Sequence, residues 1–208
     1  MQKILLGGVC ALEMITLPLV YQSVNWSWQL ACAVAMAVCL ACVRMQLKAN
    51  WWRAAALVFG CLASVGHWLW VPLMLAQVGL AWLAETQNMP VVWRESLWLV
   101  QVAFVQAGLF DLELSGLTWQ VLVLIGLLLV PVAAALWASR LPLWVSGLVL
   151  LFDAGIGLLS QQYSLLAAVL LVLVPAALST RVLKYNGVIM AALGVLIAMI
   201  VGVTRLHG

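Results

Sequence analysis

Long apolar segments, separated by short polar breaks, are the feature that most constrains the fold of this chain. A helix that spans a bilayer needs about 20 apolar residues. Only 7% of the 208 residues are charged, against about 25% in an ordinary globular domain. The apolar segments cover residues 4–21, 26–43, 54–84, 97–114, 117–139, 141–160, 164–180 and 187–204. We therefore predict an all-α polytopic integral membrane protein with seven or eight transmembrane helices, in a single transmembrane domain over residues 1–208.

Two of these segments differ from a simple membrane-spanning helix. Segment 54–84 is too long for one straight crossing and short for two, and Pro72 lies in its middle, so we expect a long helix that is kinked or broken near His67–Pro72. The first segment resembles a signal peptide, but Glu13 interrupts it and no small-residue cleavage site follows before Asn25. We interpret it as a retained first helix.

The remaining composition argues against several classes of function. The net charge of +3 is small and no basic cluster is dense enough for nucleic acid, so no nucleic-acid partner is predicted. Cys39 and Cys42 have the C-x-x-C spacing, but without a second pair or a nearby histidine we interpret them as small packing residues. The sequence has no phosphate-binding glycine loop, nucleophile elbow or metal-ligand cluster. We predict a chain that is not itself an enzyme and binds no cofactor or metal.

Asp153 is the leading candidate for a functional residue, because it is a lone carboxylate in the run Gly147-Leu-Val-Leu-Leu-Phe-Asp153-Ala-Gly155-Ile156. An ionisable side chain at the centre of a membrane span costs about 3 kcal/mol, so such a residue is a functional hypothesis by default. Burial raises the pKa of a carboxyl group, which lets it hold and release a proton near neutral pH. The alternative is a structural carboxylate that is protonated or bonded to a neighbouring helix.

Four further residues complete the predicted path for protons or ions. His67 lies in the apolar stretch His67-Trp-Leu-Trp-Val-Pro72-Leu-Met, and an unperturbed histidine has a pKa of about 6.5, which suits proton relay. Glu13 lies midway along the first segment, and Asp111 and Glu113 lie near the Ser115–Gly116 break. Each of these residues also has a purely structural interpretation, as a hydrogen-bonded packing residue or as a carboxylate at the membrane interface.

The stretches around His67 and Asp153 resemble the hydrogenase-4 component E family, whose members are membrane subunits of formate hydrogenlyase-type complexes related in part to respiratory complex I. That family has a lysine five residues before a proline, where this chain has His67 and Pro72. The family's G-L-L-x-L-E-N-G-I pattern is similar to Gly147–Ile156, with Asp153 in the place of the glutamate.

The resemblance implies a non-catalytic membrane subunit of a complex I-related, ion- or proton-translocating assembly. Its partners would be antiporter-like membrane subunits and a peripheral redox arm, within the lipid bilayer of a bacterial or archaeal inner membrane. His67 and Asp153, with Glu13, Asp111 and Glu113, would contribute to a central hydrophilic axis.

Two other functions remain open from the residues alone. A stand-alone small membrane transporter or substrate-binding component would need a central pocket with several convergent polar groups, of which the sequence shows few. A purely structural membrane scaffold would use its buried carboxylates only to pair with partners.

Overall fold

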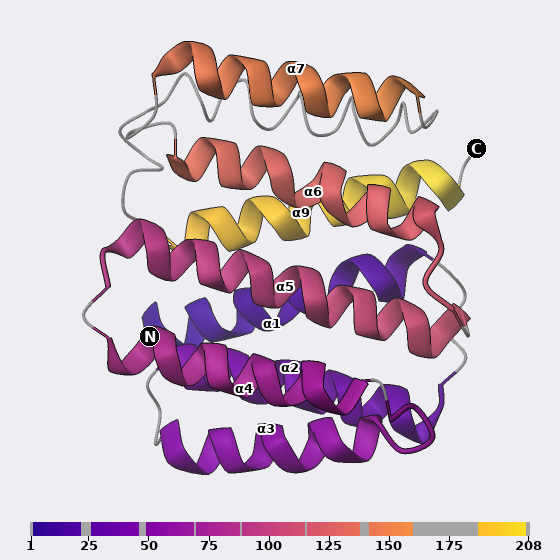
Figure 1. Ribbon diagram of the computed structural model, residues 1–208. Helices are drawn as coiled ribbons and strands as arrows, with labels where there is room; N and C mark the ends of the chain where they lie inside the picture. The colour runs from indigo at the N-terminus through magenta and orange to yellow at the C-terminus, as the bar shows by residue number, and fades with distance from the viewer. Residues whose placement is uncertain are drawn as a thin grey trace.

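The computed structural model describes residues 2–21, 26–45, 49–68, 70–87, 89–114, 116–137, 142–159 and 187–206. Every regular element in these ranges is an α-helix, as the sequence predicts. Figure 1 shows the helices, which are α1 (Gln2–Tyr21), α2 (Trp28–Arg44), α3 (Ala49–Ala63), α4 (Trp70–Thr86), α5 (Val91–Leu114), α6 (Trp119–Trp137), α7 (Leu143–Leu159) and α9 (Gly187–Leu206).

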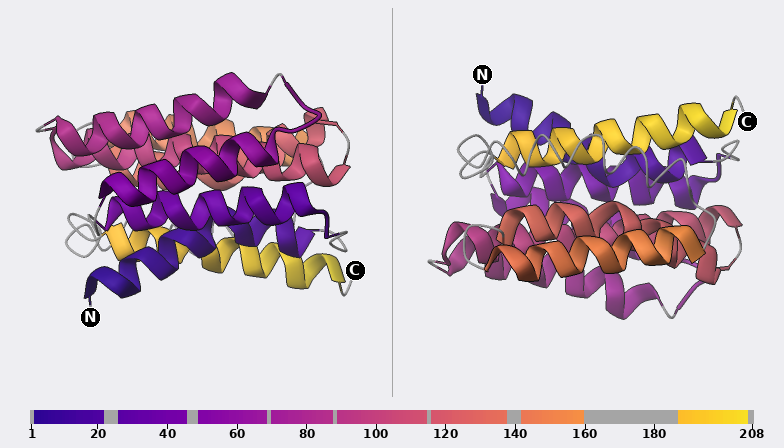
Figure 2. Two further views of the ribbon diagram at one scale, coloured as in Figure 1. Left: turned by 90° about the horizontal axis from the view of Figure 1, so that it is seen from below. Right: turned by 90° about the horizontal axis from the view of Figure 1, so that it is seen from above.

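The described helices are arranged in two layers. In the first layer α3, α2, α1 and α9 lie side by side in that order, and in the second layer α4, α5, α6 and α7 do the same. Figure 2 shows the layers edge-on, with α1 and α9 on one side and α5, α6 and α7 on the other. Contacts of α5 with α1 and α2, of α4 with α2 and α3, and of α6 with α9 join the two layers.

The core lies between the layers and along α2. Ala33, Ala37 and Ala41 recur every fourth residue on α2 and are all buried, so one face of this helix is small enough for close approach of its neighbours. A side chain at Gly60 on α3 would place its Cβ 3.0 Å from the Met36 sulfur of α2, which shows how closely α2 and α3 pack. The sequence thus favours short interhelical distances here.

The long segment 54–84 is divided into two helices by a turn. α3 ends at Ala63, and the chain turns at residues 64–68 before α4 begins at Trp70. Gly66 has φ +88°, which glycine adopts without the steric cost that other residues meet. Pro72 lies in the first turn of α4, where its missing N–H is not needed, so the proline starts a helix and does not kink one.

The prediction of a polytopic integral membrane protein with seven or eight transmembrane helices is wrong on this structure, and so is the inner-membrane location derived from it. Among the helices that the structure describes, none is both long and apolar enough to cross a membrane. Two physical features contribute. α3, α4 and α7 have 15, 17 and 17 residues, or roughly 23–26 Å of rise, less than a hydrocarbon core of about 30 Å. α5 is longer, at 24 residues, but contains Arg94, Glu95, Asp111 and Glu113.

The predicted segment 164–180 lies outside the described residues. The last expected segment, 187–204, corresponds to α9, which packs against α1.

Candidate functional site: a buried carboxylate between the helix layers

Glu13 is a carboxylate in the centre of the protein. It lies midway along α1 and is only 2% exposed. The Trp98 indole of α5 donates a hydrogen bond of 2.9 Å from Nε1 to Oε2 of Glu13. The Gln106 amide, also on α5, donates from Nε2 to the backbone oxygen of Glu13 at 2.9 Å. Both bonds cross from one helix layer to the other: the first holds the carboxylate, and the second holds the backbone of α1, against α5.

An ion pair lies next to this carboxylate. Arg44, the last residue of α2, bonds to Oε2 of Glu95 in the second turn of α5. The guanidinium carbon of Arg44 also lies 4.3 Å from the centroid of the Trp98 ring. Trp98 therefore contacts Glu13 with its N–H and Arg44 with its ring face, the side of an aromatic ring that attracts cations.

A small cavity lies beside these charged groups. Its walls are Glu13, Arg44, Glu95, Trp98, Leu99, Val132, Leu136 and Ala191, and its volume is about 10 Å³. Two buried polar atoms of the wall residues have no hydrogen-bond partner within the described structure, Oε1 of Glu13 and Nη1 of Arg44. A buried polar group without a partner costs about 1–3 kcal/mol, and more when it is charged.

The glycine at position 194 makes room for Glu13. A Cβ atom at Gly194 on α9 would lie 3.0 Å from Oε1 of Glu13 and 3.2 Å from its Cγ. A larger residue here would push against a buried side chain. The lack of a side chain at Gly194 therefore provides the space on α9 that the Glu13 side chain occupies.

Burial raises the pKa of Glu13 to about 7, from an ordinary 4.5. The hydrogen bond from Trp98 and the positive charge of Arg44 lower this pKa, whereas the negative charge of Glu95 raises it further. One turn earlier, burial raises the pKa of the Cys10 thiol to about 12, so the thiol stays neutral. Glu13 is thus the group of this cluster that changes its protonation near neutral pH.

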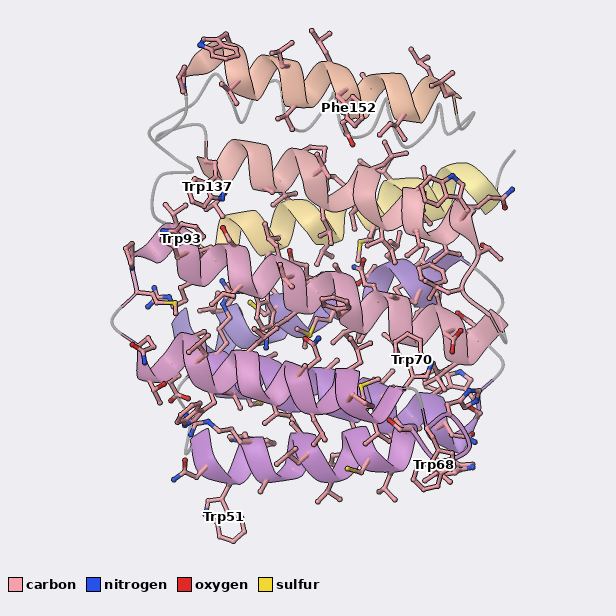
Figure 3. The ribbon with its side chains drawn as sticks, viewed as in Figure 1. Trp51, Trp68, Trp70, Trp93, Trp137 and Phe152 are labelled. Atoms are coloured by element: carbon pink, nitrogen blue, oxygen red, sulfur yellow. The ribbon has the colours of Figure 1, made fainter. Side chains whose placement is uncertain are left out.

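Asp153 lies away from this cluster. It is buried on α7, which packs against α6 at the edge of the second layer. Burial raises its pKa to about 7. Neighbouring Phe152, labelled in Figure 3 on the outermost helix of that view, is 73% exposed. Burial is the cause of the raised pKa of Asp153, whereas the pKa of Glu13 also responds to Trp98, Arg44 and Glu95.

The other predicted residues lie at one end of the bundle. His67 is exposed in the turn between α3 and α4. At the same end, labelled in Figure 3 by Trp68 and Trp70, the Trp70 indole donates a 2.6 Å hydrogen bond to Oδ2 of Asp111. Both carboxylate oxygens of Glu113 lack a partner in the described residues, and burial raises its pKa.

The structure therefore does not bring the five predicted residues into one cluster. Asp111 and Glu113 lie on the last turn of α5, His67 lies in a nearby loop, Glu13 is central, and Asp153 is on an outer helix. No cluster of three or more potential metal-ligating side chains occurs in the described ranges.

Three residues of the site, Arg44, Glu95 and Trp98, are not among the residues predicted from the sequence. A signal was nevertheless available, because Glu95, Trp98 and Gln106 are separated by three and eight residues and share one face of a helix. At the end of the bundle opposite Trp68 and Trp70, where Figure 3 labels Trp93 and Trp137, the Trp137 indole donates to the Ser96 hydroxyl at 2.9 Å, and the rings of Trp137 and Trp93 meet edge to face.

No family model, curated protein or solved structure matches this chain. The arrangement around Glu13 provides a carboxyl group that is shielded from bulk water, held by an indole donor and flanked by an ion pair. Such a group can take up and release a proton.

Proposed function

We propose that this chain is a non-catalytic subunit of a larger, complex I-related proton-translocating assembly, in which Glu13 is the residue that holds and releases a proton. The observation that carries the proposal is the setting of Glu13. Its carboxylate is buried between two helix layers, bonded by Trp98, and next to the Arg44–Glu95 pair. A protonatable group in such a place is typical of proton-handling sites.

The outer surface supports membership of an assembly. Large apolar side chains are exposed on several helices; among them are Trp51 at 78%, Trp119 at 77%, Phe152 at 73% and Leu151 at 71%. Extensive exposed apolar surface marks sites of interaction with other molecules. The resemblance to the hydrogenase-4 component E family suggests antiporter-like and redox subunits as the partners.

The small volume of the cavity argues against the alternative of a stand-alone transporter or substrate-binding component. At about 10 Å³ it has the size of one water molecule. Pockets for small organic ligands have volumes of about 300–1,000 Å³. A substrate could not bind beside Glu13 without a large rearrangement of α1, α5 and α9.

The scaffold alternative has a specific observation in its favour. Two ion pairs, Arg44–Glu95 and Arg53–Glu85, join helices of different layers. In a scaffold Glu13 would only add a third polar link between the layers. The two functions differ in whether the proton on Glu13 is exchanged.

The first experiment tests the assembly. The tagged full-length chain is purified under mild conditions, and the proteins that co-purify are identified by mass spectrometry. We expect antiporter-like and redox subunits in defined stoichiometry. If the chain is expressed at its natural level and is nevertheless recovered alone, the proposal is contradicted.

The second experiment tests Glu13 directly. Infrared difference spectra are recorded across pH 5–9 for the wild type, Glu13→Gln and Asp153→Asn. We expect carboxyl absorption of the wild type that titrates near neutral pH, of which one component is lost in Glu13→Gln and another in Asp153→Asn. If Glu13→Gln retains the whole titrating band while the assembly still forms, the chain is a scaffold and Glu13 is not a proton carrier.

A further inference from the structure

The cavity beside Glu13 contains complementary unpartnered groups. Oε1 of Glu13 can accept a hydrogen bond and Nη1 of Arg44 can donate one, and neither has a partner in the described part of the chain. Both residues line the same cavity of about 10 Å³. One buried water molecule needs about this volume and two to four polar neighbours. The site therefore satisfies the two requirements for a structural water.

We propose that a single ordered water molecule binds in this cavity, bridges Arg44 and Glu13, and relays the proton of Glu13 to Glu95. The water accepts from Nη1 of Arg44 and bonds to Oε1 of Glu13. The third polar residue of the cavity wall is Glu95, whose side chain is 13% exposed and so has access to solvent. This inference deepens the proposed function, and its relay step rests on that function.

The relay conserves protons and the water. As the O–H bond of the Glu13 carboxylic acid breaks, its proton passes to the water oxygen. One of the other protons of the water passes to a carboxylate oxygen of Glu95, which then exchanges with solvent. Transfer through one water is within the reach of ordinary acid–base chemistry.

The charged and titratable groups around Glu13 are few. From α2 it faces Arg44, from α5 Glu95, and on its own helix Cys10. The described side chains of α9, residues 191–200, include no ionisable group. The water and Glu95 are therefore the available proton acceptors in this part of the protein.

Two cavity-filling variants test the inference from different helices. Ala191→Val on α9 and Val132→Ile on α6 each add apolar atoms to the wall of the cavity. Ala198→Val is the matched control, because Ala198 is a buried alanine of the same helix, seven positions after Ala191 and outside the cavity wall. Circular dichroism and thermal melting select the variants that fold.

The readout is the water O–H stretch in infrared difference spectra, identified by its shift in H₂¹⁸O, together with the rate of protonation of Glu13 after a pH jump. We expect the wild type and Ala198→Val to show the isotope-sensitive band. Ala191→Val and Val132→Ile should lose it, with protonation of Glu13 slowed by about tenfold or more. Absence of the band from the wild type, or its persistence in both filling variants, would overturn the water site.

The outcomes separate this inference from the proposed function. If the carboxyl band of Glu13 titrates but no isotope-sensitive water band is seen, the proposed water site is wrong and the proposed function stands. A water band in a protein whose Glu13 does not titrate overturns the proposed function and leaves the water site. Loss of the water with an unchanged protonation rate overturns the relay alone.

Discussion

Glu13 and Asp153 are both buried carboxylates with a pKa of about 7, but they lie in different surroundings. Glu13 is between the layers, where Trp98 donates to it and Arg44 and Glu95 adjust its charge state. Asp153 is on α7, and among the described residues burial is what raises its pKa. Burial is therefore enough to move the pKa of a carboxyl group towards neutral pH, whereas partners such as Trp98, Arg44 and Glu95 adjust that pKa further.

The largest expected effect concerns side-chain packing, which differs between the centre of the bundle and helix α7. Phe110 on α5 is fully buried, whereas Phe152 on α7 is 73% exposed. We expect Phe110→Ala to lower the free energy of unfolding by about 3–5 kcal/mol, and Phe152→Ala to change it by less than about 0.5 kcal/mol. Denaturant unfolding measures both. Equal losses would mean that α7 is packed as tightly as the centre and would remove the basis of the comparison.

The next effect is the pH dependence of stability. The pKa of Glu13 is higher in the folded protein, about 7, than its ordinary 4.5, so the folded state binds the proton more tightly. The stabilisation is complete below pH 4.5 and is lost as the pH rises through about 7, by about 3 kcal/mol in total. Glu13→Gln should abolish this loss, as seen in unfolding curves recorded between pH 4.5 and 8.

Asp153→Asn is the matched variant for that measurement. Burial raises the pKa of Asp153 from an ordinary 3.8 to about 7, so we expect Asp153→Asn to remove a loss of stability of similar size as the pH rises through about 7. An unchanged pH dependence in Asp153→Asn would mean that its carboxyl group is in contact with water in the folded protein.

A smaller effect follows from the hydrogen bond to Glu13. Trp98→Phe keeps a ring but removes the indole donor, and a bond to a charged group contributes about 1.5–3 kcal/mol. Since this bond lowers the pKa of Glu13, the variant should titrate at higher pH than the wild type, measured from its carboxyl band. Trp144→Phe on α7, at an exposed position, is the control and should leave both stability and titration unchanged.

The smallest effect concerns the ion pair. A double-mutant cycle with Arg44→Met and Glu95→Gln should give a coupling free energy of about 1 kcal/mol, because the pair is partly exposed and screened by solvent. The neighbouring Arg94 is exposed, so Arg94→Met with Glu95→Gln is the comparison cycle and should show no coupling. Equal coupling in the two cycles would argue that Arg44 has no special role beside Glu13.

The sequence allowed part of this site to be predicted. Glu13 and Asp153 stand out as single carboxylates within apolar runs, and both are buried in the structure. Trp98 could not be paired with Glu13 because 85 positions separate them. Arg44 and Glu95 are 51 positions apart, so their pairing also depends on how α2 and α5 pack.

The sequence by itself determined the helices, since apolar segments separated by glycine, proline and polar breaks favour helix after helix. It did not determine how far each helix extends, and the prediction of membrane spans was wrong because no described helix is both long and apolar enough to cross a membrane. The partners of Glu13 depend on the packing of the helices. Helical periodicity acts over a few residues, whereas the contacts of Glu13 with α5 and α9 exist only when helices distant in sequence pack together.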